Sequence, residues 1–233
     1  MQELRLDICT LRTRESPLPD GPAKVVTDAE ALRMRTIVLF AHPAQRRSSI
    51  NLAMASEARK LTNVSFVDLY EEYPRFEIDV DREQARLSAH DLIVFQFPTF
   101  WYSTPAILKE YQDLVLEYGF AYGPAGKKLD GKFLLVATTT GGSEHDYSSD
   151  GGNRHPFRSF LLPLEQTASL CGMRFLPPFV LHSANHIESE SARGHIFAYG
   201  RLLSAVSSGD LDPASLMSRD LLTRSSIPTV VGV

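Results

Sequence analysis

The chain has only two cysteines in 233 residues, Cys9 and Cys171, and they form no CxxC pair. This usage gives neither a disulfide framework nor a zinc-binding pattern, so we expect no metal site. No uninterrupted apolar stretch reaches the roughly 18–20 residues that a membrane span needs. The first residues, MQELRLDICTLRTRESPLPDGPAK, also lack the apolar core of a signal peptide. We therefore expect a cytoplasmic protein.

A strong charge of one sign is missing as well. The 24 basic and 28 acidic residues are interspersed and give a net charge of −4. Because there is no basic patch, we expect neither nucleic acid nor anionic lipid as a partner. What is present is a hydrophobic fraction of 43%, which is enough for one core in a chain of this length.

The positions of the prolines suggest how the chain is organised. Residues 1–34 contain prolines that interrupt any regular element, so we interpret them as an N-terminal extension. Residues 35–208 carry a regular alternation of apolar patterns and are predicted to form a single domain. Residues 209–233 are polar and contain Pro213 and Pro228, which predicts a C-terminal tail.

Within the domain, the apolar patterns alternate between strand and helix. Short apolar runs predict strands at residues 36–41, 64–69, 91–97, 133–138 and 174–181. Helical spacing predicts helices at about residues 50–61, 79–89, 105–118, 158–170 and 189–207.

Particular residues are expected to start, stop or bend these elements. Thr104 and Pro105 should begin the third helix, and Gly119 should end it. Pro163 should kink or shorten the fourth helix. The pair Pro177–Pro178 interrupts the last strand, which predicts an edge position or an early end.

This alternation predicts an α/β fold, a parallel sheet with helices on both faces. Five strands in so short a chain fit the flavodoxin-like strand order 2-1-3-4-5 better than the six-stranded dinucleotide order. The first strand-to-helix turn also lacks the G-x-G-x-x-G pattern of conventional NAD-binding units.

The turn after the first strand carries residues that suit a phosphate. His42, Ser48, Ser49 and Asn51 precede or begin a predicted helix, whose N-terminus offers free N–H groups and the positive end of the helix dipole. The alternative is structural: Ser48 and Asn51 would cap the helix, and His42 would be a hydrogen-bonded histidine at a strand end.

Two further strands end in segments that suit a flat ligand. Pro98–Tyr102 would form a stiff apolar wall for a planar ring, or alternatively an aromatic cluster that closes the core. Thr139–Gly142 combines small hydroxyl residues with two glycines, so its backbone can lie close to a ligand. Because the carboxyl ends of parallel strands share one sheet edge, the three segments predict one binding site.

Together these segments resemble the flavodoxin-like NAD(P)H:quinone oxidoreductases, in particular the bacterial subgroup with the ancillary oxidoreductases of glutathione-gated potassium efflux systems. The likeness covers about residues 35–205. Its motifs are AHP at 41–43, S-x-x-N at 48–51, P-x-x-WYS-x-P at 98–105, GFAYG at 119–123, TTGG at 139–142, PLEQTA-x-x-CGM at 163–173 and LPPF at 176–179.

The resemblance implies that the domain binds FMN. It also implies a two-electron, ping-pong reaction in which NADH or NADPH is the donor and a quinone or similar molecule the acceptor. By matching position, the phosphate would be surrounded by His42, Ser48, Ser49, Ile50 and Asn51. The isoalloxazine would be held by Pro98, Thr99, Phe100, Trp101, Thr139, Thr140, Gly141 and Gly142.

Further roles also come from the resemblance. Tyr147 matches a tyrosine near the flavin that assists charge stabilisation, which makes it a catalytic candidate. The second catalytic candidate, His155, matches a histidine of some bacterial members, and the favoured alternative is a histidine of a surface loop. Asn153 stands where the animal quinone reductases have a histidine. Phe120 and Tyr122 match aromatic residues that reach the partner's flavin pocket in a homodimer, with ordinary packing as the alternative.

Two other functions stay open. The chain could be a regulatory ancillary subunit of a glutathione-gated potassium efflux antiporter, held through that partner at the inner face of the membrane. It could also be a flavodoxin-type electron carrier. The modest charge and the WYS and GFAYG segments favour an enclosed substrate pocket over a carrier.

Overall fold

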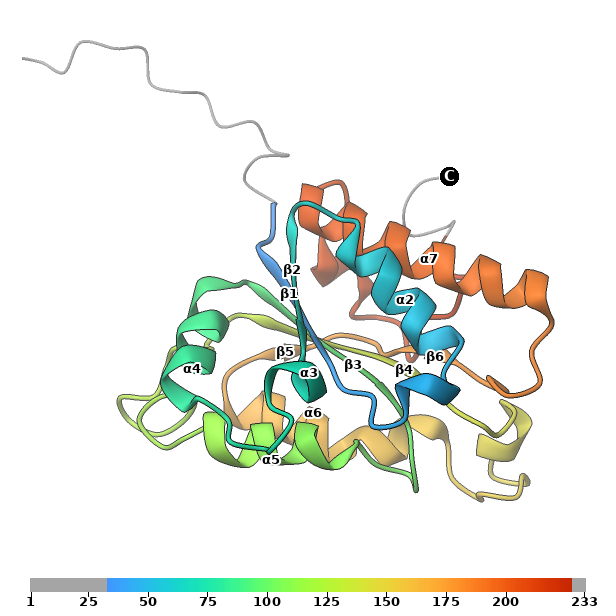
Figure 1. Cartoon of the computed structure of the whole chain (residues 1–233), viewed down its shortest axis with the longest axis horizontal. Helices are drawn as coiled ribbons and strands as arrows, with labels where there is room; N and C mark the ends of the chain where they lie inside the picture. Colours follow the sequence, from blue (N-terminus) through green and yellow to red (C-terminus); the bar gives the residue numbers. More distant parts are fainter. Residues whose placement is uncertain (1–32, 228–233) are drawn as a thin grey trace, which may run out of the picture.

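A parallel β-sheet lies at the centre of the computed structural model, which describes residues 33–227 (Figure 1). Its strands are β1 (Thr36–Phe40), β2 (Val64–Asp68), β3 (Leu92–Pro98), β4 (Phe133–Thr139), β5 (Arg174–Phe175) and β6 (Phe179–Leu181). All pairings are parallel in the order β2-β1-β3-β4-β5, and β6 also pairs with β4. The predicted flavodoxin-like order is therefore confirmed.

The edge strand of this sheet is split in two. β5 pairs with the beginning of β4, at Phe133 and Leu134, and β6 pairs with its end, at Ala137–Thr139. Pro177 and Pro178 lie between the two pieces and have no N–H to donate to a ladder. The prolines therefore interrupt an edge strand, as the sequence predicts, and the strand resumes after them.

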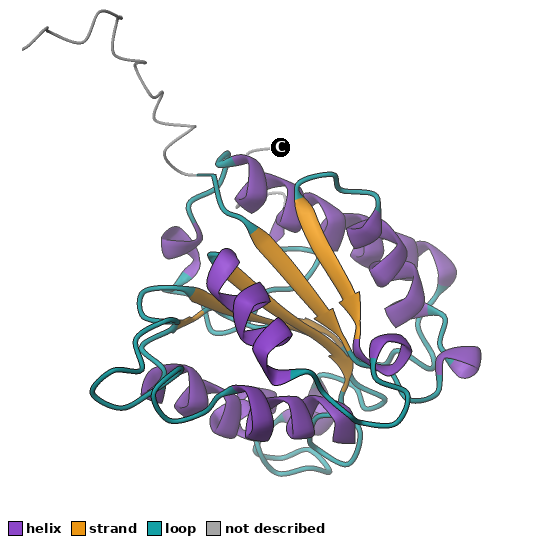
Figure 2. Ribbon diagram, turned by 60° about the vertical axis from the view of Figure 1, so that its left-hand side comes forward, coloured by secondary structure: helices purple, strands orange, loops and turns teal. Residues whose placement is uncertain are grey.

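Helices cover both faces of the sheet. They are α2 (Ile50–Arg59), α3 (Leu69–Glu72), α4 (Val80–Ala89), α5 (Ala106–Val115), α6 (Leu162–Leu170) and α7 (Ser189–Ser208). α2 and α7 pack on one face, and α3 to α6 pack on the other (Figure 2). In β1, Ile37 and Leu39 face the second group while Val38 faces the first. Burial on both faces explains why the strands are continuous apolar runs.

Two expectations about helix ends are wrong. α5 begins at Ala106 after Pro105 in the N-cap position, so Thr104 does not cap it. α5 also ends at Val115, before Gly119. Gly119 instead has a φ of 89° in the following turn, where its N–H donates to the Tyr122 carbonyl at 2.9 Å. Its conformational freedom therefore shapes a turn rather than a helix terminus.

The effect expected of Pro163 is found. A short 3₁₀ helix, Phe157–Leu161, precedes α6, which starts at Leu162 and holds Pro163 in its first turn. Proline is tolerated there because the first N–H groups of a helix have no partner within it. The helix predicted from residue 158 is thus shortened at its start.

The segment after α7 is packed, although we assigned residues 209–233 to a tail. Leu211, Leu216, Leu222 and Ile227 are buried in the same cluster as α2 and α7. Leu222 also covers the outer edge of β6, because its carbonyl accepts from the Val180 N–H at 2.9 Å. Residues 209–227 therefore complete the core on this face.

Other parts of the expected organisation lie outside the described residues. These are residues 1–32, which make up nearly all of the expected N-terminal extension, and residues 228–233. Between residues 33 and 227, no helix combines the length and hydropathy that a membrane crossing requires.

The packing of the C-terminal segment can be tested with Leu222→Ala. Leu222 is fully buried, so the truncation should lower the free energy of unfolding by about 2–5 kcal/mol in urea denaturation. Met217→Ala is the matched control, because Met217 is 42% exposed in the same segment and should cost roughly 0.5 kcal/mol or less. Equal small losses for both variants would contradict the packed segment.

Candidate functional site

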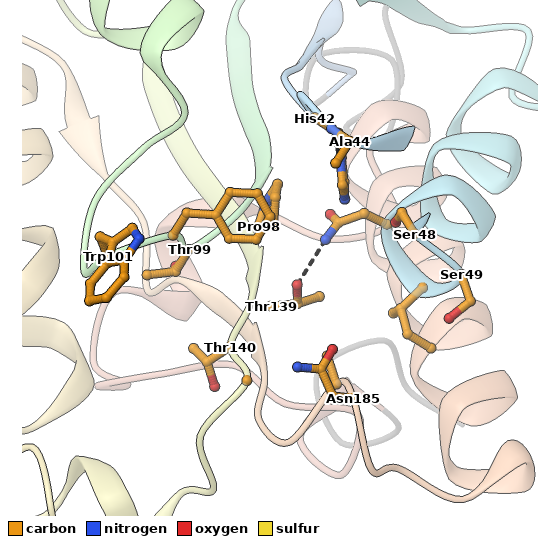
Figure 3. Close-up of a pocket in the computed structure, with 15 residues that line it drawn as sticks. His42, Ala44, Ser48, Ser49, Pro98, Thr99, Trp101, Thr139, Thr140 and Asn185 are labelled. Atoms are coloured by element: carbon orange, nitrogen blue, oxygen red, sulfur yellow. Dashed lines mark hydrogen bonds between the residues drawn. The ribbon is translucent and has the colours of Figure 1, made fainter. Parts of the chain in front are cut away.

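A cleft of about 520 Å³ opens where β1, β3 and β4 end (Figure 3). The strands are in register, with Phe40 beside Gln96 and Pro98 beside Thr139, so their ends meet at one edge. The cleft is lined by His42, Ala44, Ser48, Ser49, Ile50, Asn51, Pro98, Thr99, Phe100, Trp101, Thr139, Thr140, Gly141, Ala184 and Asn185. All residues expected to bind the cofactor are among them except Gly142, which lines an adjoining cavity.

The polar end of the cleft is the beginning of α2. Ser49 occupies the N-cap position without a side-chain cap, and the Ala53 N–H makes the first helical bond to the Ser49 carbonyl. The N–H groups of Ile50 and Asn51 come before this bond, so they have no acceptor within the helix. Neither Ser48 nor Asn51 caps α2 with its side chain, so the capping alternative is not supported. This end can take an anion.

Asn51 links the cleft to the core. Its Nδ2 donates to Thr139 Oγ1 at 2.8 Å, and its carbonyl accepts from Gln96 Nε2 at 2.9 Å. Tyr199 of α7 in turn donates its hydroxyl proton to Gln96 Oε1 at 3.1 Å. Asn51 Oδ1 is buried and finds no partner among residues 33–227. Such an acceptor costs roughly 1–3 kcal/mol, so it marks a position for a donor on a ligand.

His42 is held in one tautomer at the wall of the cleft. The Ala44 N–H donates to its Nδ1 at 3.1 Å, which leaves the proton of the neutral ring on Nε2. Burial lowers the pKa of His42 below its ordinary value, and the Asp68 carboxylate only partly opposes this. His42 therefore offers a neutral N–H donor near pH 7.

The apolar end of the cleft is a strained turn. Phe100 and Ser103 exchange both backbone hydrogen bonds at 3.1 Å, and the two residues between them, Trp101 and Tyr102, have φ of 49° and 64°. Positive φ at both central residues is typical of turns built from Asn and Gly, and aromatic residues are strained there. Trp101 is 93% exposed at the rim. Strain of this kind clusters at binding sites, which favours the ligand wall over a core cluster.

The segment Thr139–Gly142 is clamped by the chain after β6. The Thr140 N–H donates to the Leu181 carbonyl, the Ala184 N–H donates to the Thr140 carbonyl and the Ser183 N–H donates to the Gly142 carbonyl, each at 2.9 Å. A Cβ on Gly141 would lie 3.3 Å from Asn185 Nδ2. A side chain at position 141 would therefore have to displace the Asn185 amide.

Sequence reasoning missed Ala184 and Asn185, although both line the cleft. They follow the last strand of a parallel sheet, whose carboxyl end falls at the same edge as the three recognised segments. That position in the topology could have identified them. Alanine and asparagine at these positions match none of the ligand-binding motifs recognised in the sequence, so the residue types alone did not identify them.

An adjoining cavity of about 290 Å³ contains Tyr147. It is lined by Thr99, Trp101, Tyr102, Gly142, Asp146, Tyr147, Gly152 and Asn153. Tyr102 donates its hydroxyl proton to Asn153 Oδ1 at 3.1 Å. Burial raises the pKa of Tyr147, so its hydroxyl keeps its proton at neutral pH. Asn153 therefore lines this cavity together with Tyr147, whereas His155 is not among its lining residues.

The other expected site residues lie elsewhere in this subunit. His155 contacts the Phe160 ring edge-on, with 6.2 Å between centroids. Phe120 and Tyr122 pack against the core cluster on the α3–α6 face and line neither the cleft nor the adjoining cavity. Their contact with the cleft of a second subunit stays a prediction.

The strain at Trp101 predicts that a substitution which relieves it will stabilise the fold and weaken ligand binding. Trp101→Asn should raise the free energy of unfolding by roughly 1–2 kcal/mol, because asparagine tolerates the left-handed backbone and an exposed indole loses little packing. The same change should weaken ligand binding in the cleft. Phe197→Asn is the control, since Phe197 is an exposed aromatic residue in the ordinary helical backbone of α7. A destabilised Trp101→Asn protein would contradict the strain.

Comparison with known proteins defines the family. Residues 34–200 match the family described as a flavodoxin-like fold. General stress protein 14 of Bacillus subtilis (strain 168) is 43% identical over 157 residues, 67% of this chain and 90% of that protein. The glutathione-regulated potassium-efflux system ancillary protein KefG of Enterobacter sp. (strain 638) is 41% identical over 171 residues, 73% of this chain and 93% of that protein. The chain therefore belongs to this flavodoxin-like family.

Solved structures share the architecture. General stress protein 14 of Treponema denticola in complex with FMN is 34% identical, with a TM-score of 0.68 over 75% of this chain and 99% of that one. An NADPH-quinone reductase from P. pentosaceus is 26% identical, with a TM-score of 0.65 over 72% of this chain and 97% of that one. A chain described as a tryptophan halogenase from Streptomycin violaceusniger is 38% identical, with a TM-score of 0.69 over 70% and 95%. The names of these three proteins indicate different activities, so what they have in common with this chain is the fold.

Proposed function

We propose that this protein is an FMN-dependent NAD(P)H:quinone oxidoreductase that works by a ping-pong mechanism. The observation that carries the proposal is a cleft that has the uncapped start of α2, suited to an anion, at one end and a stiff apolar wall at the other. The FMN complex of general stress protein 14 and the NADPH-quinone reductase, both similar in fold, support the choice of cofactor and reaction.

The residues of the cleft fit a flavin mononucleotide. The free N–H groups at the start of α2, with the Ser48 and Ser49 hydroxyls, would bind one phosphate. The unpartnered Asn51 Oδ1 is an acceptor, so it suits a sugar-like hydroxyl rather than the phosphate itself. Thr139–Gly141 and the turn at Trp101 would hold the flat ring.

Bound FMN would supply the hydride chemistry that couples the oxidation of NAD(P)H to the reduction of a quinone. The chain's own residues bind, orient and exclude water. Trp101 and Phe100 form the apolar side against which donor and acceptor would lie in turn. Tyr147 keeps its proton at neutral pH, so its hydroxyl can donate to negative charge that develops nearby.

A second function is supported by the KefG relative, named as an ancillary protein of a potassium-efflux system. In this case the protein would be a regulatory subunit that a membrane partner holds at the inner face, while the domain itself is cytoplasmic. Its flavin site would then take part in regulating the membrane partner.

We also propose that the protein forms a homodimer in which Phe120 or Tyr122 of one subunit lies near the cleft of the other subunit.

Cofactor binding can be tested with Gly141→Val. The added side chain would enter the space between Gly141 and Asn185, so FMN affinity in fluorescence titration should fall at least about tenfold, or 1.4 kcal/mol. Gly152→Val is the control, because a Cβ there meets only Asp146 Oδ1 at 3.9 Å and lies outside the main cleft. Wild-type affinity in the Gly141→Val protein would remove this segment from the site.

Turnover provides the second test. Because donor and acceptor would use one cleft in turn, double-reciprocal plots should give parallel lines. Tyr147→Phe should slow NAD(P)H-dependent bleaching of the flavin absorbance by about 10²-fold while FMN stays bound, since only a hydroxyl is lost. Intersecting lines would contradict the shared cleft. An FMN-loaded protein with no quinone turnover from either nicotinamide would favour the regulatory subunit.

A further inference from the structure

His182 lies behind the flavin-facing loop and is absent from every motif of the sequence. It follows β6 and its Nδ1 lies 3.1 Å from Thr140 Oγ1. The Thr140 hydroxyl also lies 2.8 Å from the Gly142 carbonyl, to which it must donate, because a carbonyl oxygen only accepts. A hydroxyl has one proton, so Thr140 Oγ1 must accept from His182. His182 therefore carries its proton on Nδ1.

His182 is neutral in this position. Burial lowers its pKa below the ordinary value, and the Glu144 carboxylate opposes the shift only in part. Aromatic rings hold it in place: Tyr147 and Phe157 each lie 5.6 Å from it between ring centroids. The ring thus has one defined tautomer and one defined orientation.

The Thr140 hydroxyl, oriented by His182, is one of two donors to the Gly142 carbonyl. It accepts from the Thr140 hydroxyl at 2.8 Å and from the Ser183 N–H at 2.9 Å, so both of its lone pairs are engaged by the protein. In contrast, over the part of the chain that the structure describes, the N–H groups of Gly141 and Gly142 donate to no protein acceptor. The loop accordingly has free donors and an engaged carbonyl. That polarity suits a ring that carries carbonyl oxygens and acceptor nitrogens.

We propose that His182 is a positioning residue for the cofactor site. It acts through Thr140. The Nδ1–H bond orients the threonine hydroxyl, which engages the Gly142 carbonyl and so fixes the peptide planes of residues 140–142 with the N–H groups of Gly141 and Gly142 free for the flavin ring. The inference rests on the proposed function, because it assigns part of the FMN affinity to a residue outside the cleft.

The test compares two substitutions of His182. His182→Leu keeps the bulk but removes the donor, which leaves Thr140 Oγ1 without its partner, so the Kd for FMN in fluorescence titration should rise about tenfold. His182→Asn can place an amide N–H where Nδ1–H was, so its Kd should stay within about threefold of wild type. His90→Leu is the control, because His90 is also a hydrogen-bonded histidine but precedes β3 at the amino end of the strands, away from the cleft, so it should leave the Kd unchanged.

A second pair of variants tests the route through Thr140. Thr140→Val removes the hydroxyl that joins His182 to Gly142, so adding His182→Leu to it should raise the Kd no further. If His182 only packed against its neighbours, the losses of FMN affinity caused by His182→Leu and Thr140→Val would instead add up, and His182→Asn would bind FMN as weakly as His182→Leu. Should His182→Leu fail to fold, the asparagine variant on the wild-type and Thr140→Val backgrounds gives the same comparison, and a loss in both alike contradicts the proposal.

The outcomes separate this inference from the function it rests on. If wild-type protein binds FMN and His182→Leu binds it equally well, only the positioning role is overturned. If wild-type protein does not bind FMN, the proposed function fails and the positioning role fails with it. Tighter binding by His182→Asn than by His182→Leu, with unchanged thermal unfolding of the FMN-free proteins, supports both.

Discussion

A buried chain of hydrogen bonds joins the helices on one face of the sheet, and the sheet itself, to the cleft. It runs from Tyr199 of α7 through Gln96 of β3 to Asn51 of α2 and on to Thr139 of β4. Polar groups this deep in a core destabilise the fold unless each finds a partner, so they fix the relative position of the elements that carry them. The helix start that would bind phosphate and the strand end that would hold the ring are thereby placed against each other. Among residues 33–227, Asn51 Oδ1 is the acceptor of this network that has no partner, and under the proposed function it would accept a hydrogen bond from the ligand.

The backbone around the cleft is constrained in two places. The turn at Trp101 and Tyr102 has left-handed residues where glycine or asparagine would be more stable. The loop at Thr140 holds its Gly142 carbonyl in bonds to Thr140 and Ser183. In both places the local backbone is constrained so that apolar surface and N–H donors are available to a ligand. The core supplies the stability that these constraints require.

Much of the fold follows from the sequence, because buried parallel strands read as continuous apolar runs and their helices show the 3.6-residue period. The three segments at 42–51, 98–102 and 139–142 were recognisable since glycine, proline and hydroxyl residues are unusual together at strand ends. Asn185 and His182 were not, because their roles arise from contacts across the sheet edge. The packed segment around Leu222 was also missed, since its few apolar residues lie among polar ones without a period.

The most direct measurement is a crystal structure of the protein grown with FMN. The account predicts one FMN per cleft, with its phosphate on the free N–H groups at the start of α2 and its ring between the Trp101 turn and Thr139–Gly142. A hydroxyl of the ribityl chain should lie within hydrogen-bond distance of Asn51 Oδ1. Crystals without FMN at saturating concentration, or with the phosphate away from Ser48–Asn51, would contradict the account.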